Sequence, residues 1–165
     1  MDNGLFYPKN NPIMKENITI AIADDSPLMR KSVCSFLKEM GFEVVIEAEN
    51  ANDLLQQLQQ SEVLPQVCLL DYKMPRMNGA ELAAILSRQY PEIKLAALTT
   101  ENSLSCMVDM ISNGCTAYFI KNGDPTEWHS GIRQLVIKGH YFTEWMQQAL
   151  LNFIKVNSEG INRMV

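Results

Sequence analysis

Acidic residues stand directly after two apolar segments of this chain. Asp24 and Asp25 follow the run 18–23, and Asp71 follows the run 66–70. A carboxylate at the end of a buried strand costs stability unless a positive charge or a donor pairs with it. Three carboxylates in one pocket would also repel one another, and an oxygen-only ligand set suits a hard cation such as Mg²⁺. We therefore expect these residues to form a Mg²⁺ site.

Two further apolar segments end on residues that could complete such a site. Thr99 ends the run 93–99, and Lys121 follows the run 117–120. A metal ion, a lysine and a hydroxyl donor around a carboxylate are the groups that stabilise an in-line phosphoryl transfer. The carboxylate at the centre, Asp71, is then the expected phosphoryl acceptor.

Each of these features also has an ordinary explanation. Asp24 and Asp25 precede a Ser-Pro pair and could merely cap a helix, and the segment 74–79 could be a simple loop whose Gly79 serves a turn or opens a helix. A single threonine or lysine at a strand end usually has no special role. The functional interpretation is favoured because all four features come together at successive strand ends.

The elements that would position these residues alternate regularly. Strands are expected at 18–23, 42–48, 66–70, 93–99 and 117–120, and helices at 27–40, 51–60, 82–90, 104–111 and 125–138. Five strand–helix units in strict alternation predict an α/β fold with a parallel sheet covered by helices on both faces. In such folds the functional crevice lies beyond the carboxyl ends of the strands, where the polar residues above stand.

Composition excludes several other classes of protein. The chain has 165 residues, is 47% hydrophobic and carries a net charge of −5, with no cluster of Lys and Arg that would indicate direct nucleic-acid binding. No apolar run is long enough to span a membrane, and residues 1–16 read as a flexible polar leader without a signal peptide. The four cysteines lack metal-type spacing, so we expect reduced thiols in a cytoplasmic protein and no zinc site.

Residues 17–140 closely resemble the receiver domain of two-component response regulators. The resemblance rests on the acidic pair at 24–25, "LLDYKMPRMNG" at 69–79, "ALTT" at 97–100 and "AYFIK" at 117–121, which occur in the order and spacing of that family. It implies a doubly wound, flavodoxin-like sheet with strand order 2-1-3-4-5. It also implies a signalling switch that assists its own phosphorylation but is not a turnover enzyme.

The resemblance implies specific roles at the predicted site. Asp71 looks like the phospho-acceptor, and Asp25, Asp71 and the backbone carbonyl of Lys73 look like the Mg²⁺ ligands, with Asp24 acting mainly through water. The phosphoryl donor would be a sensor histidine kinase.

Three further positions match the residues that respond to phosphorylation in this family. Thr99 is similar to the switch hydroxyl, Lys121 to the lysine that pairs with the phosphoryl group, and Tyr118 to the aromatic residue whose rotamer reports activation. They would shift the surface made by the fourth helix, fifth strand and fifth helix. Lys73 and Glu101 occupy positions that tune the phosphoryl lifetime, and we hypothesise that they pair and hinder attacking water.

The C-terminal part points to one branch of the family. Asn122 stands where many receivers have proline, and the segment "GHYFTEWMQQALLNFI" resembles the region that leads to the effector in the LuxR/NarL-type branch. Residues 141–165 are expected to form a helix and the start of a linker. The stripe of Phe142, Met146, Ala149, Leu150 and Phe153 would pack on the same domain, with a homodimer contact as the alternative.

Only 11 residues follow Ile154, too few for a helix-turn-helix, so DNA binding would need an effector domain that this sequence lacks. A truncated transcription regulator is favoured over a stand-alone receiver that acts through protein contacts. A degenerate receiver that works without phosphorylation is a further alternative. An aspartyl phosphatase is disfavoured because it would need a D-x-D pattern after the first strand, whereas Asp24 and Asp25 are adjacent.

Overall fold

The computed structural model describes residues 17–162, and the exposure of side chains up to residue 158. The elements in chain order are β1 (Thr19–Ala23), α1 (Pro27–Glu39), β2 (Glu43–Ala48), α2 (Ala51–Gln60), β3 (Val67–Leu70), α3 (Gly79–Gln89), β4 (Lys94–Thr99), α4 (Leu104–Ser112), β5 (Ala117–Ile120), α5 (Pro125–Lys138) and α6 (Glu144–Asn162). The expected leader, residues 1–16, and the last residues, 163–165, lie outside the described part.

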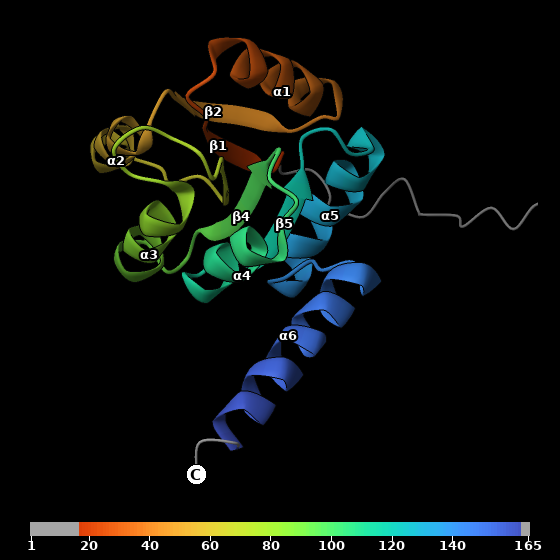
Figure 1. Cartoon of the computed structure of the whole chain (residues 1–165). Coiled ribbons are helices and arrows are strands. Elements are labelled where there is room, and N and C mark those ends of the chain that lie inside the picture. Colours follow the sequence, from red (N-terminus) through yellow and green to blue (C-terminus); the bar gives the residue numbers. More distant parts are fainter. Residues whose placement is uncertain (1–16, 163–165) are drawn as a thin grey trace, which may run out of the picture.

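All neighbouring strands of the sheet pair in parallel, in the order β2-β1-β3-β4-β5 (Figure 1). Helices α1 and α5 cover one face, and α2, α3 and α4 cover the other. Every residue of the central strand β3 is buried, as expected for a parallel strand with helices on both faces. The predicted fold class and strand order are confirmed.

The strand register brings the predicted polar residues to one edge of the sheet. Ala23 at the end of β1 is level with Leu70 at the end of β3, and Thr99 is level with Ile120 at the end of β5. Hydrogen bonds continue the pairing past these ends, from the amide of Asp71 to the carbonyl of Ala23 at 2.9 Å. The acidic and basic side chains that follow the strands therefore share one crevice.

Helix α3 starts at Gly79, one of the two roles expected for this glycine, three residues before the first periodic apolar residue, Leu82. The side chain of Asn78 accepts a hydrogen bond from the amide of Glu81, and the side chain of Glu81 accepts one from the amide of Asn78. This capping box adds the first turn. A Cβ at position 79 would lie 2.2 Å from the carbonyl oxygen of Asp71, so only glycine lets the helix begin this close to the site.

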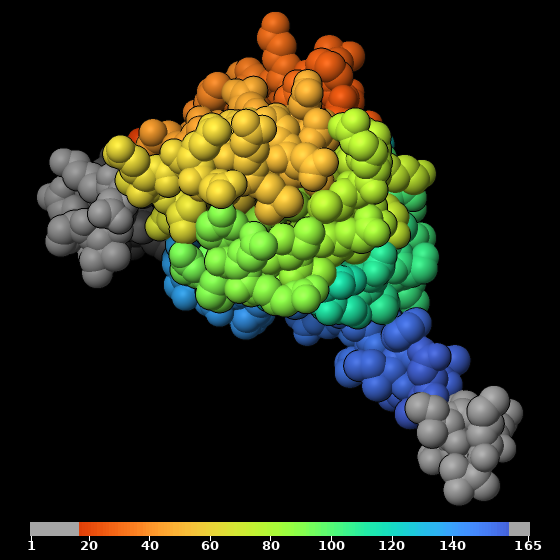
Figure 2. All heavy atoms as spheres, turned by 90° about the vertical axis from the view of Figure 1, so that its left-hand side faces the viewer, coloured from red at the N-terminus to blue at the C-terminus, as the bar shows by residue number. Residues whose placement is uncertain are grey.

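Helix α6 begins against the sheet edge and then leaves the body of the protein (Figures 1 and 2). Just before it, the amide of Tyr141 donates to the carbonyl of Thr116 at 2.9 Å, and the Tyr141 ring stacks on Phe119. Met146 is buried, whereas Phe153 is exposed. Phe142, Ala149 and Leu150 also pack against the core, so the predicted apolar stripe packs on the domain as far as Leu150. Within residues 17–162, no helix is long and apolar enough to cross a bilayer.

Candidate functional site

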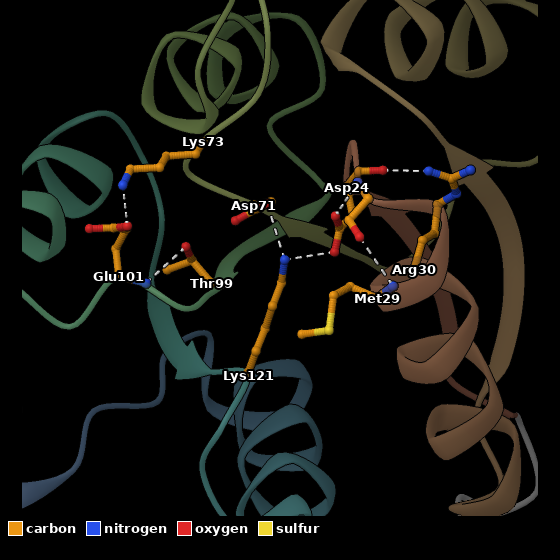
Figure 3. Close-up of polar contacts among 9 residues, drawn as sticks. Asp24, Met29, Arg30, Asp71, Lys73, Thr99, Glu101 and Lys121 are labelled. Atoms are coloured by element: carbon orange, nitrogen blue, oxygen red, sulfur yellow. Dashed lines mark hydrogen bonds and ion pairs between the residues drawn. The ribbon is translucent and has the colours of Figure 1, made fainter.

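Three charged side chains meet beyond the carboxyl ends of β1, β3 and β5 (Figure 3). The Nζ atom of Lys121 lies 2.7 Å from Oδ2 of Asp24 and 3.0 Å from Oδ2 of Asp71. The Lys121 side chain is 4% exposed, and both carboxylates are buried. One ammonium group therefore serves two buried carboxylates, which leaves this pocket with a net negative charge.

Contacts with the start of α1 fix the orientation of Asp24. Its Oδ1 atom accepts a hydrogen bond from the amide of Ser26 at 2.9 Å, and its backbone carbonyl accepts one from Nη1 of Arg30 at 2.5 Å. Ser26 in turn caps α1 by accepting from the amide of Met29. Hydrogen bonds to both the side chain and the backbone of Asp24 thus fix the loop that carries the acidic pair.

The site has the donor set that a hard cation needs. One carboxylate oxygen from each of Asp24, Asp25 and Asp71 lies within 4.8 Å of the other two, and Asp25 is exposed. Oδ2 of Asp24 is buried and, within residues 17–162, has no hydrogen-bond partner beyond its ion pair with Lys121. Three carboxylates, one of them open to solvent, fit Mg²⁺ with water in the remaining positions. That the backbone carbonyl of Lys73 is a further Mg²⁺ ligand stays a prediction.

Burial dominates the titration of Asp71. It raises the pKa of this carboxyl above its usual value of 3.8. The charge and hydrogen bond of Lys121 and the hydroxyl of Thr99 lower the pKa again, whereas the negative charge of Asp24 raises it further. The ionised form therefore depends on positive charge close by, and a bound divalent cation would favour it further.

The two predicted switch residues both contact Glu101, in the loop between β4 and α4. Oγ1 of the buried Thr99 accepts a hydrogen bond from the Glu101 amide at 3.3 Å, and the hydroxyl of the buried Tyr118 donates to the Glu101 carbonyl at 2.5 Å. The position of this loop is therefore linked to both side chains.

The structure brings together the pair that was expected to tune the phosphoryl lifetime. Nζ of Lys73 lies 2.6 Å from Oε1 of Glu101, and the Lys73 side chain is 72% exposed (Figure 3). The hydrogen bond to Glu101 raises the pKa of Lys73. This ion pair lies at the rim of the pocket that contains Asp71, and its effect on hydrolysis stays a prediction.

Sequence reasoning missed one residue of the site, Arg30. Its position, five residues after Asp25 and fourth in the first helix, offered no signal in a single sequence. Only the fold turns its guanidinium back to the carbonyl of Asp24.

Comparison with known proteins agrees with this geometry. The sequence model of the family described as the response regulator receiver domain matches residues 20–133. The chain belongs to this family. The receiver domain of NarL from Mycobacterium tuberculosis superimposes with a TM-score of 0.66 at 27% identity, over 73% of this chain and 97% of that one. The predicted likeness to the LuxR/NarL-type branch is thus confirmed.

Two curated relatives of this receiver have different outputs in their names. The transcriptional regulatory protein DegU of Brevibacillus brevis is 28% identical over 133 residues, which are 80% of this chain and 56% of DegU. The chemotaxis protein CheY of Listeria monocytogenes is 31% identical over 104 residues, 63% of this chain and 86% of CheY. The receiver thus spans little more than half of the DegU relative and most of the CheY relative.

Proposed function

We propose that this receiver is a phosphorylation-dependent switch in which Asp71 accepts a phosphoryl group from a sensor histidine kinase. The observation that carries the proposal is the buried Lys121, shared by Asp24 and Asp71 at the point where three strands end. An Oδ atom of Asp71 would form the new bond to phosphorus, while the bond from phosphorus to the donor's imidazole nitrogen breaks and that nitrogen keeps the electron pair.

The other residues of the pocket have clear parts in this chemistry. Asp24, Asp25 and Asp71, with the Lys73 carbonyl, would hold Mg²⁺, which supplies positive charge to the transferring phosphoryl group. Lys121 would pair with a phosphoryl oxygen once Asp71 has lost its free charge, and the Thr99 hydroxyl would donate to another. Lys121 therefore exchanges a carboxylate partner for a phosphoryl partner during the reaction.

Phosphorylation would reach the surface through Glu101. If Thr99 turns to the phosphoryl group, it gives up the hydrogen bond that it accepts from the Glu101 amide, and the loop that Tyr118 also holds is released. The surface of α4, β5 and α5 would then shift. The exposed Lys73–Glu101 pair would close the rim of the pocket against water and so lengthen the life of the phosphoryl group.

The output would be transcription, through an effector domain, because DegU carries that role in its name and extends beyond the matched region. The match to CheY favours the alternative of a stand-alone receiver that acts through protein contacts, with a second copy of the chain as one such contact. A cytoplasmic location, where the four buried free thiols would stay reduced, also stays a prediction.

The decisive experiment is phosphorylation by acetyl phosphate, followed by intact mass with and without Mg²⁺. We expect one acid-labile phosphoryl group, dependent on Mg²⁺, on the wild-type chain and none on Asp71→Asn. Asp25→Asn should require a higher Mg²⁺ concentration. A folded wild-type protein that binds Mg²⁺ but gains no mass from any donor would instead favour a receiver that works without phosphorylation.

A further inference from the structure

Tyr72, the residue directly after Asp71, connects the phosphorylation loop to α4. Its hydroxyl donates a hydrogen bond to Oδ2 of Asp109 at 3.0 Å, across 37 positions of sequence. Its backbone carbonyl accepts from the amide of Gly79 at 2.9 Å, at the start of α3. The half-buried ring packs against the core beneath α3 and α4. One residue next to the phospho-acceptor is therefore attached to both helices.

Asp109 is held in place to receive this hydrogen bond. The side-chain amide of Asn113 donates to Oδ1 of Asp109 at 3.1 Å and to the Asp109 carbonyl at 2.8 Å. Both carboxylate oxygens thus have a partner, and the rotamer is fixed. Because the acceptor is a carboxylate, the bond from Tyr72 is stronger than one between neutral groups.

The other contacts near Asp71 hold the loop before α4 and not the helix itself. Lys73, Thr99 and Tyr118 all bind Glu101, which precedes α4. Within the described residues, the bond between Tyr72 and Asp109 is the one side-chain hydrogen bond that joins segment 71–79 to α4. Helix α4 in turn packs against the first half of α6: Leu104 and Ile111 of α4 share a cluster with Ala149 and Leu150 of α6.

We propose that Tyr72 holds α4 to the Asp71 loop in the unphosphorylated protein, and that this bond sets how readily α4, with α6 packed on it, moves on phosphorylation. The second half of this proposal rests on the proposed function. Movement of α4 away from the loop must break the bond and leave Oδ2 of Asp109 without its partner. Tyr72→Phe keeps the ring but removes the donor, so it should raise the population of displaced α4 by about tenfold.

Hydrogen–deuterium exchange of the whole chain, without a phosphoryl donor, tests the first half. We expect the amides of residues 104–112 to exchange about tenfold faster in Tyr72→Phe than in the wild type, with α5 unchanged. Tyr141→Phe is the matched control, because its hydroxyl contacts Glu127 on α5 at 3.5 Å. Equal exchange of α4 in Tyr72→Phe and wild type would overturn the proposal, as would equal acceleration in every helix.

A double-mutant comparison identifies the partner. Asp109→Ala should speed amide exchange in α4 as Tyr72→Phe does. The double variant should exchange little faster than either single variant, because both changes remove the same hydrogen bond. Asp109→Asn keeps an acceptor oxygen and should have a smaller effect. Fully additive effects of Tyr72→Phe and Asp109→Ala would show that the two residues act separately and would overturn the proposal.

Acetyl phosphate with Mg²⁺ tests the second half, with phosphoryl uptake measured by mass on the same samples. Wild-type α4 should exchange faster once phosphorylated, and Tyr72→Phe, already fast, should change less. Uptake without any acceleration of α4 would overturn this half. Absence of uptake would defeat the proposed function and this half together, while the comparison without donor would still decide whether Tyr72 restrains α4.

Discussion

Two lysines near Asp71, Lys121 and Lys73, form ion pairs at nearly the same distances. Lys121 lies 2.7 Å from Asp24 and 3.0 Å from Asp71, and Lys73 lies 2.6 Å from Glu101. The side chain of Lys121 is 4% exposed, whereas that of Lys73 is 72% exposed. The distances alone would predict ion pairs of similar strength, but the Lys121 pairs are buried and the Lys73 pair is exposed.

The difference has a simple physical origin. Water can replace either partner of the exposed pair, and salt screens their attraction, so the Lys73 pair adds little to stability. The charges of Lys121, Asp24 and Asp71 have lost most of their hydration, and removing the ammonium of Lys121 would leave two buried carboxylates without compensation. The buried group therefore suits chemistry that depends on charge, and the exposed pair suits control of access.

Removing the buried ammonium should have the largest effect. We expect Lys121→Met to lower the free energy of unfolding by about 3–5 kcal/mol, because two buried carboxylates lose their counter-charge. Lys73→Met is the matched control and should leave the unfolding midpoint nearly unchanged. Urea denaturation of both variants without Mg²⁺ measures this. Similar losses in the two variants would contradict the comparison.

Removing a buried negative charge should have the opposite sign. Asp71→Asn should raise the free energy of unfolding by about 1 kcal/mol, because burial disfavours the ionised carboxylate and Asp24 still pairs with Lys121. Asp25→Asn, at an exposed position, should change the free energy of unfolding by less. Thermal unfolding at neutral pH without Mg²⁺ compares them, and a lower midpoint for Asp71→Asn would be evidence against this account.

The gain from Asp71→Asn should depend on pH. Because the folded-state pKa of Asp71 lies above its ordinary value of 3.8, ionisation costs stability in the folded protein. The cost is absent below about pH 3.8 and grows as the pH rises through the folded-state pKa. The difference in unfolding free energy between the two proteins should therefore be near zero at acid pH and reach a plateau toward neutral pH. A constant difference would exclude Asp71 as its source.

The smallest effect on stability is expected at the exposed pair, where the readout is kinetic. Lys73→Ala should speed the loss of the phosphoryl group without changing the unfolding midpoint, because the rim opens to water. High salt should raise the rate of phosphoryl loss in the wild type toward that of the variant, since salt screens the attraction between Lys73 and Glu101. An unchanged decay rate in Lys73→Ala would remove the proposed role in phosphoryl lifetime.

Local signals were enough for most elements. The bounds of α2 and α5 agree with the periodicity. For Gly79 the sequence left open a turn or a helix start, and the capping box of Asn78 and Glu81 makes it the start of α3. Alternation of strands and helices predicted a parallel sheet, and the family motifs supplied its strand order. From the sheet edge it followed that Asp24, Asp71 and Lys121 would meet.

The sequence by itself therefore determined the elements, the crevice and the chemical types within it, because periodicity and strand-end position are local properties. The tertiary structure decided which groups pair. It gave one ammonium to two carboxylates, turned Arg30 back to the Asp24 carbonyl and joined Tyr72 to Asp109. It also left residues 151–158 of α6 exposed within the part of the chain that the structure describes. Apart from the local contact of Arg30 with Asp24, these contacts depend on how distant segments pack together, which no spacing along a single chain encodes.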